Sequence, residues 1–293
     1  MITADNTPKD RQWNVLPLLT IGEGSGSSAN VNGRMLGYRP PGALDGIGAF
    51  AVDEKTVRIL VNHELEASAG YPYRLSNDTV LTGARISYFD IDTETLLLQA
   101  GGLAYDRVID RGGREVLHAV QIDEGFNGGG FDSLCSAQAV RASDSEFRSD
   151  IYFAGEEVAE FGEEAKDGFG GQAVAIDVKR RVAYVIPMLG RAAFENVAAI
   201  ETGSRDKIAL LIGDDRQAGP LYLYIGQKEG KPEGNNGYQP PEFLVKNGLG
   251  LGRLFVWVAD SGERTPEQFH GTGEIRGGQF IPIRHFDPNN SAL

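Results

Sequence analysis

Cysteine, histidine and positive charge are all scarce in this sequence. The only cysteine is Cys135, so no disulfide can form within the chain, and a multi-cysteine zinc site is excluded. Lysine and arginine total 28 against 41 acidic residues, which gives a formal net charge of −13. Because binding to phosphate backbones requires a basic face, this balance argues against a nucleic-acid partner. It is compatible with a protein that gathers cations.

Long hydrophobic runs are also missing. The apolar runs are no longer than a β-strand, so the sequence predicts no membrane span. The first residues, Met1–Trp13, are polar and lack the apolar core of a signal peptide. The sequence therefore leaves two origins open: a cytoplasmic protein, or a mature domain without its leader.

Glycine, in contrast, is abundant. There are 39 glycines without a collagen-like period, and 13 prolines, which is typical of a fold with many tight turns rather than a helical bundle. Short β-branched and aromatic runs bounded by turn signals predict an all-β domain spanning residues 1–293. We expect a short helix at Ala159–Lys166 and a long polar loop with little core at Gly226–Gly252. The expected strands are Thr56–Asn62, Arg85–Ile91, Val116–Ile122, Asp150–Ala154, Ala173–Val178, Val182–Met188, Lys207–Ile212, Leu221–Ile225 and Leu254–Val258.

Three segments share one pattern, in which an apolar strand ends in acidic or metal-binding residues and a second strand and a hairpin follow. The strand ends are Asn62-His63-Glu64, Gly155-Glu156-Glu157 and Gly213-Asp214-Asp215. This is the order in which a propeller blade is built, with inner strands that meet near a central axis. The sequence therefore predicts a β-propeller.

In such a fold the acidic strand ends converge. Several carboxylates at one place raise one another's pKa unless a cation neutralises them, and calcium prefers oxygen ligands of this kind. Alternatively, each acidic pair is a solvated turn, His63 is a structural histidine and Cys135 is a small buried hydrophobe. We predict Glu64, Glu156, Glu195 and Asp214 as calcium ligands, with Asp45, Asn62, His63, Glu157, Asn196 and Asp215 as further ligands or supporting residues.

Together with Phe194-Glu195-Asn196, these motifs occur in an order that resembles the PhoX-type alkaline phosphatases, within a wider group of bacterial propeller proteins of mostly unknown function. The resemblance runs from about Pro40 to Gly226. It implies a secreted or periplasmic six-bladed propeller that hydrolyses small phosphate monoesters. It also implies a metal site with calcium and, in the phosphatases, iron, in which the metals activate water for attack on phosphorus. No side-chain nucleophile is implied.

Two departures from the family pattern have consequences. Gly155 stands where the phosphatases are expected to carry an iron-binding cysteine, which argues against iron. The chain is also shorter than family members, so we expect it to lack the last blade or blades.

Two functions stay open. The first is a calcium-dependent phosphoric monoester hydrolase, with a phytase-like or lactonase-like propeller as a variant on another substrate. The second is a non-catalytic, calcium-stabilised propeller that serves as a binding module.

Overall fold

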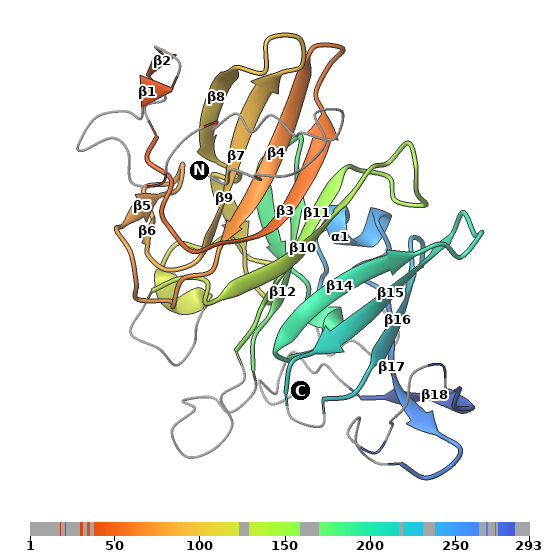
Figure 1. Ribbon diagram of the computed structural model, residues 1–293. Helices are drawn as coiled ribbons and strands as arrows, with labels where there is room; N and C mark the ends of the chain where they lie inside the picture. The colour runs from red at the N-terminus through yellow and green to blue at the C-terminus, as the bar shows by residue number, and fades with distance from the viewer. Residues whose placement is uncertain are drawn as a thin grey trace, which may run out of the picture.

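The computed structural model describes residues 38–122, 129–158, 170–216, 219–230, 238–263 and 275–284, together with positions 18, 21, 30–31, 34–35, 268 and 273. Within these residues the structure is dominated by strands (Figure 1). The helical elements there are α1 (Glu242–Lys246) and the 3-10 turns η2 (Ala119–Gln121) and η3 (Pro187–Leu189). The prediction of an all-β fold is confirmed.

Three larger sheets form the body of the described chain, and in each the antiparallel strands are laid down mainly in chain order. The third strand of each sheet pairs with the second and the fourth, as in a propeller blade. The first sheet contains β3 (Leu44–Ala51), β4 (Thr56–His63), β7 (Arg85–Asp92) and β8 (Leu98–Leu103). The second contains β10 (Leu134–Val140), β11 (Ile151–Glu156), β12 (Ala173–Asp177) and β13 (Val182–Val185), with β9 (Arg107–Ile109) parallel to β13. The third contains β14 (Phe194–Ile200), β15 (Lys207–Asp214), β16 (Tyr222–Gln227), β17 (Gly252–Ala259) and β18 (Gly278–Ile283). Two short ribbons pair β1 (Asn30–Val31) with β2 (Arg34–Met35), and β5 (Tyr73–Arg74) with β6 (Val80–Leu81).

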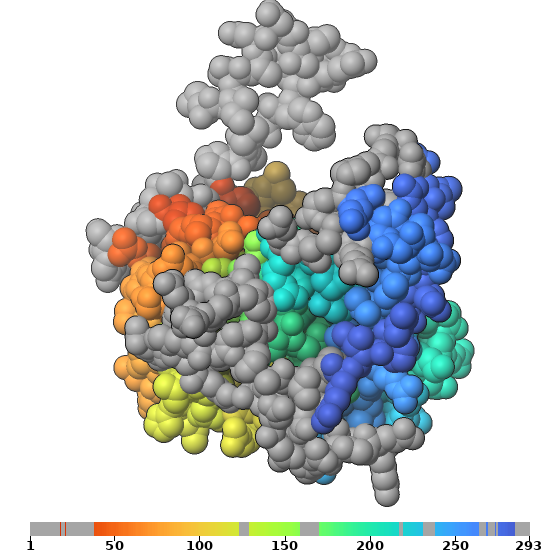
Figure 2. Space-filling view, turned by 90° about the horizontal axis from the view of Figure 1, so that it is seen from below, coloured from red at the N-terminus to blue at the C-terminus, as the bar shows by residue number. Residues whose placement is uncertain are grey.

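The first strands of the three sheets lie next to one another. Strand β10 contacts both β3 and β14, and Figure 2 shows the surfaces of the first sheet, in orange, and the third sheet, in teal and blue, on either side. The approach of β3 to β10 requires glycine at Gly46, since a Cβ there would lie 2.6 Å from the backbone nitrogen of Ala137. One hydrophobic core fills the space between the first and second sheets, and another fills the space between the second and third.

Two of the predicted elements are wrong. Val116–Ile122 is not a strand, because the Gln121 side chain accepts hydrogen bonds from the backbone N–H groups of Leu117 and His118 and closes the turn at η2. The described part of the segment 226–252 contributes to the core, since Phe243, Leu244 and Leu249 are buried against the second and third sheets.

The expected helix at Ala159–Lys166 lies outside the described residues, as do the last residues of the chain. None of the helices in the described part has the length and apolar character needed to cross a bilayer.

Candidate metal centre

The same local geometry recurs where each of the three sheets begins. The first two strands pair at one position, and the register then shifts through a β-bulge on the first strand. Bulges of this kind bend a strand and turn the neighbouring side chains in a new direction. The paired positions before the bulges are Leu44 with His63, Leu134 with Glu156, and Phe194 with Asp214.

A backbone hydrogen bond fixes the next residue in each sheet. The donor is the backbone N–H of the residue that follows the paired position on the second strand. The acceptor is the carbonyl of the residue that precedes the first strand. The three bonds are Glu64 to Ala43 at 2.8 Å, Glu157 to Ser133 at 2.9 Å, and Asp215 to Ala193 at 2.9 Å.

Two chemically active residues per sheet follow from this geometry, one in the bulge and one at the end of the second strand. We call the six together the carboxylate–thiol cluster. Its members are Asp45 and Glu64 from the first sheet, Cys135 and Glu157 from the second, and Glu195 and Asp215 from the third.

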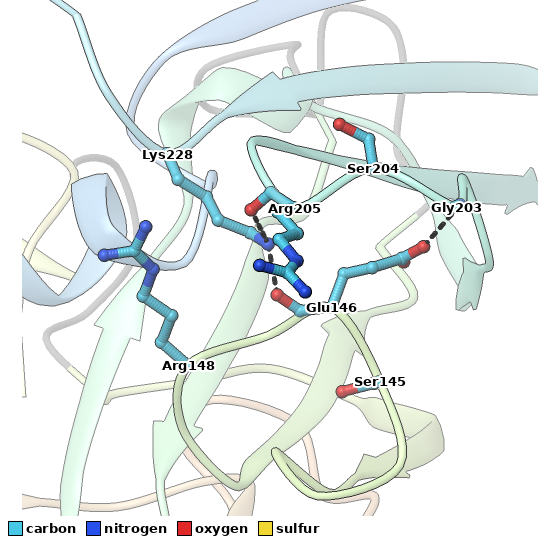
Figure 3. A pocket seen from close by; sticks show the side chains of 7 residues that line it. All are labelled: Ser145, Glu146, Arg148, Gly203, Ser204, Arg205 and Lys228. Atoms are coloured by element: carbon cyan, nitrogen blue, oxygen red, sulfur yellow. Dashed lines mark hydrogen bonds between the residues drawn. The ribbon is translucent and has the colours of Figure 1, made fainter.

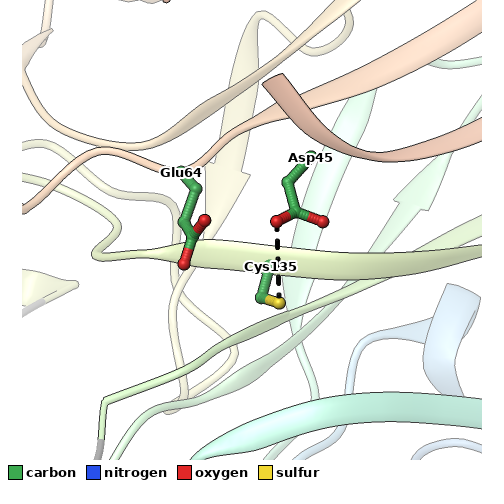
Figure 4. Close-up of side chains that lie close together, drawn as sticks. All are labelled: Asp45, Glu64 and Cys135. Carbon is green, nitrogen blue, oxygen red and sulfur yellow. Dashed lines mark hydrogen bonds between the residues drawn. The ribbon is translucent and has the colours of Figure 1, made fainter. Parts of the chain in front are cut away.

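The Cys135 thiol is the shared member of this cluster. Potential ligand atoms of Asp45, Glu64 and Cys135 all lie within 4.8 Å of one another, and the same holds for Cys135, Glu157 and Glu195. Figure 4 shows the first of these groups, in which the carboxylates of Asp45 and Glu64 both lie above the thiol. The thiol lies 3.9 Å from a carboxylate oxygen of Asp45 and 3.8 Å from one of Glu195. Cys135 is buried and Glu157 is half-buried, whereas the other members are exposed.

The electrostatics of the cluster favour a cation. Partial desolvation of the exposed side chain, and then a hydrogen bond and the charge of Asp45, raise the pKa of Glu64. Burial, a hydrogen bond with Glu157 and the neighbouring carboxylates raise the pKa of the Cys135 thiol. The thiol hydrogen bond lowers the pKa of Glu157, but burial and the contact with Asp215 raise it by more. A bound cation would oppose the repulsion that these groups experience.

The donor set fits a metal on chemical grounds. Carboxylate oxygens are the ligands that calcium prefers, and a thiolate is a ligand for iron or zinc. The cluster offers both kinds of donor.

Of the four main predicted ligands, the structure brings Glu64 and Glu195 into the cluster. Asp45, Glu157 and Asp215, predicted as further ligands, also lie there. The other two main predicted ligands, Glu156 and Asp214, are the strand neighbours of cluster members. Successive side chains of a strand point to opposite faces of the sheet. Glu156 and Asp214 are each one position away from a cluster member, so their side chains point away from the cluster.

Glu156 serves the protein interior. Its carboxylate accepts hydrogen bonds from the backbone N–H groups of Asp132 and Gln172, each at 2.9 Å. Burial raises the pKa of Glu156 to about 8, and the two backbone hydrogen bonds act in the opposite direction. The side chain therefore links the backbone at Asp132, before β10, to the backbone at Gln172, before β12, on the side of the sheet away from the cluster.

Asp214 is engaged in an ion pair. Both of its carboxylate oxygens bind the guanidinium of Arg216, and one also accepts the backbone N–H of Ala193 at 3.2 Å. The carboxylate is fully buried. Its oxygens are therefore used within the third sheet.

The remaining predicted residues support the cluster from behind. Asn62 is buried; its amide donates to the backbone carbonyl of Cys135 and accepts from the Tyr152 hydroxyl at 2.9 Å, which fixes the bulge that carries the thiol. Asn196 donates to the Ser136 hydroxyl at 3.0 Å.

His63 is a buried structural histidine. Its ring nitrogens contact the carbonyl of Gly42 at 3.0 Å and the hydroxyl of Ser87 at 2.6 Å. Burial lowers the pKa of His63 to about 4, so the ring is neutral over the physiological range.

The structure places Cys135 beside carboxylates, whereas the sequence showed no clear partner for this residue. Sequence reasoning took Gly155 as the position where a thiol would stand, but a Cβ at Gly155 would lie 2.3 Å from the Cβ of Phe194. A side chain there would displace Phe194, and the thiol of this chain comes instead from β10. The absence of cysteine at position 155 is therefore no argument against a thiolate-binding metal.

The substitution Gly155→Ala is expected to lower the free energy of unfolding by about 1–3 kcal/mol, because it overpacks the contact with Phe194. Urea unfolding measures the effect. The matched control is Gly213→Ala, at the equivalent position of the third sheet, where the added Cβ would lie 3.7 Å from its nearest neighbour. Equal stability of the two variants would contradict the packing argument.

Known proteins resemble this chain in structure rather than in sequence. No family model matches the chain, and no curated protein sequence matches it. Among solved structures, the chain is similar to Pseudomonas fluorescens PhoX in complex with vanadate, a transition state analogue, with 15% sequence identity and a TM-score of 0.48. The alignment covers 82% of this chain and 48% of that one, so this chain spans about half the length of PhoX. At this identity and overlap, neither family membership nor a shared activity follows.

Proposed function

We propose that this protein is a metal-dependent phosphoric monoester hydrolase whose metal ions are held by the carboxylate–thiol cluster. The observation that carries the proposal is the convergence of carboxylates and a thiol from three sheets through the same bulge geometry. Such a repeated arrangement of like charges is stabilised by cations. The choice of phosphate monoesters is supported by the order of sequence motifs, which resembles that of the PhoX-type alkaline phosphatases.

The chain's own residues would divide the work between two neighbouring groups. Asp45, Glu64 and Cys135 form one group, and Glu157 and Glu195 form the other together with the same thiol. The carboxylates suit calcium, and the thiolate suits iron or another transition metal. Bound metals would supply positive charge for the phosphoryl oxygens and an activated water.

The environment of the cluster fits a small substrate. Asp45, Glu64 and Glu195 are exposed, so a phosphate monoester can approach them from solvent. The buried supports, Asn62 above all, hold the thiol in place while the substrate binds. A secreted or periplasmic location belongs to the same proposal and is supported by the same resemblance.

A second candidate is a non-catalytic propeller that calcium stabilises and that binds a partner. The position of the cluster where three sheets meet favours it, because a cation there would join the sheets and raise stability by linkage. A rise in melting temperature with calcium, without turnover of any phosphoester, would select this function over the first.

Glu195→Gln is expected to lower hydrolysis of p-nitrophenyl phosphate by at least about 100-fold, since even groups that only support metal ligands contribute 10- to 100-fold. Metal content per chain is measured on the same samples. The matched control is Glu201→Gln, which changes an exposed carboxylate directly after the far end of the same strand and should leave activity unchanged. Wild-type activity in Glu195→Gln would contradict the assignment, and an inactive wild type with bound metal would favour the second candidate.

A further inference from the structure

A pocket of about 400 Å³ opens at the opposite end of the second and third sheets from the carboxylate–thiol cluster (Figure 3). It lies between the turn that joins β10 to β11, the turn that joins β14 to β15, and the end of β16. Its lining is basic, although the chain as a whole is strongly acidic. The lining residues are Ser145, Glu146, Arg148, Gly203, Ser204, Arg205 and Lys228.

This pocket is separate from the candidate metal centre. Cys135 and Glu195 lie near the beginnings of β10 and β14, whereas the pocket residues follow the ends of these strands. Each strand has 7 residues, and a rise of about 3.3 Å per residue puts roughly 20 Å between the two sites.

Lys228 is the central feature of the pocket. Only 3% of its surface is exposed, and its ammonium donates to the backbone carbonyls of Glu146 and Arg205. These two bonds use two of the three ammonium protons and join the two turns. Within the described part of the chain no carboxylate forms an ion pair with Lys228, and burying an unpaired charge is costly. Burial and then the charge of Arg148 lower the pKa of Lys228, and the charges of Glu146 and Asp206 act in the opposite direction.

The carboxylate of Glu146 is committed to the turn instead. One of its oxygens accepts the backbone N–H groups of Thr202 and Gly203, each at 2.7 Å. Figure 3 shows this side chain directed toward Gly203 and away from Lys228. It fixes the shape of the pocket.

Two arginines add charge at the pocket wall. Arg148 is about half exposed and meets Glu229 only at 3.5 Å, in a contact between two exposed side chains that contributes little. Arg205 is exposed, and its backbone carbonyl binds Lys228. A guanidinium group can bind two phosphate oxygens at once through two N–H groups. The Ser204 hydroxyl accepts a hydrogen bond from the backbone N–H of Asp206 at 3.2 Å and can donate its own proton to the same anion.

We propose that this pocket binds a doubly charged phosphate group, with Lys228, Arg148 and Arg205 as the binding cations. Its volume exceeds that of a free phosphate ion and lies in the range of small-molecule sites, so the natural ligand is a small phosphorylated compound rather than orthophosphate alone. The proposal does not depend on the function of the metal centre.

Isothermal titration with inorganic phosphate and with ribose 5-phosphate tests the proposal on the intact chain. The double variant Arg148→Ala/Arg205→Ala should weaken binding by at least about 100-fold, because each lost charge-assisted hydrogen bond weakens binding about tenfold or more. These arginines are exposed, so the variant should fold normally. Tighter binding of ribose 5-phosphate than of phosphate identifies an organic phosphate as the ligand; equal binding identifies free phosphate.

The same titrations in Glu157→Gln distinguish this site from the metal centre. Phosphate binding that persists in Glu157→Gln and disappears in the arginine double variant supports the pocket. Binding that disappears in Glu157→Gln and persists in the double variant would assign all phosphate binding to the metal centre and overturn the inference. Lack of binding of either compound at millimolar concentration to Glu157→Gln would overturn it as well.

Discussion

Replacing Glu157 by glutamine is expected to lower the affinity of the protein for its metal by at least about 100-fold, whereas replacing the adjacent Glu156 should leave metal binding nearly unchanged. The two side chains differ by one position on the same strand end. Glu157 lies within 4.8 Å of Cys135 and Glu195 through its ligand atom, and Glu156 is bound to backbone N–H groups of the interior. Even residues that only orient ligands contribute 10- to 100-fold to metal affinity, so loss of a ligand should exceed this.

Glu156→Gln should instead affect the fold. One of its two accepting oxygens becomes an amide nitrogen that faces a backbone N–H, and the free energy of unfolding should fall by about 1–3 kcal/mol. The variant also has a pH signature. Because burial raises the pKa of Glu156 from 4.5 to about 8, the native state keeps a proton that the unfolded state releases, and this contribution to stability is lost as pH rises between these values. Metal-free Glu156→Gln should therefore lack this part of the fall in the free energy of unfolding as the pH rises.

Elemental analysis of both variants, together with urea unfolding at pH 5 and pH 8, checks the pair of expectations. Metal content at the wild-type level in Glu157→Gln, or loss of metal in a well-folded Glu156→Gln, would reverse the assignment of the two residues.

Two of the strands that the sequence predicted are fully buried. Strands β11 and β12 are buried along their whole length and begin with runs of four apolar residues, and burial on both faces of a sheet selects such runs. The first strands of the first and second sheets were missed, because β3 is Leu-Asp-Gly-Ile-Gly-Ala-Phe-Ala and β10 is Leu-Cys-Ser-Ala-Gln-Ala-Val. Small residues there allow strands to approach closely, and they carry little β-propensity.

The prediction of the metal ligands was incomplete for a related reason. Where two acidic residues are adjacent, as Asp214 and Asp215 are, the sequence alone does not show which one faces the site. The orientation of each side chain depends on strand register. The register here is set by bulges on the three first strands, which are tertiary features. Without β10, the thiol of Cys135 had no predicted partners, and its place among carboxylates of three sheets could not be found.

Cys135→Ser is expected to abolish most of the pH dependence of transition-metal binding while calcium affinity changes by only a few-fold. Burial, the hydrogen bond with Glu157 and the nearby carboxylates raise the pKa of this thiol, so it is protonated at neutral pH in the metal-free protein. A metal that binds the sulfur must displace that proton, and the affinity should therefore rise about tenfold per pH unit between roughly pH 6 and pH 8. A serine hydroxyl does not ionise in this range, so its variant should lose that slope. Calcium, held by carboxylate oxygens, provides the internal control.

Competition between the protein and a chromophoric chelator for Zn²⁺ at pH 6, 7 and 8 measures the slope, and titration in buffers of different ionisation enthalpy counts the protons released. The serine variant should release about one proton fewer than the wild type. An identical slope in both proteins would show that the sulfur does not bind the metal. The cluster would then act as an all-oxygen site, which favours calcium and weakens the case for a transition metal in the proposed hydrolase.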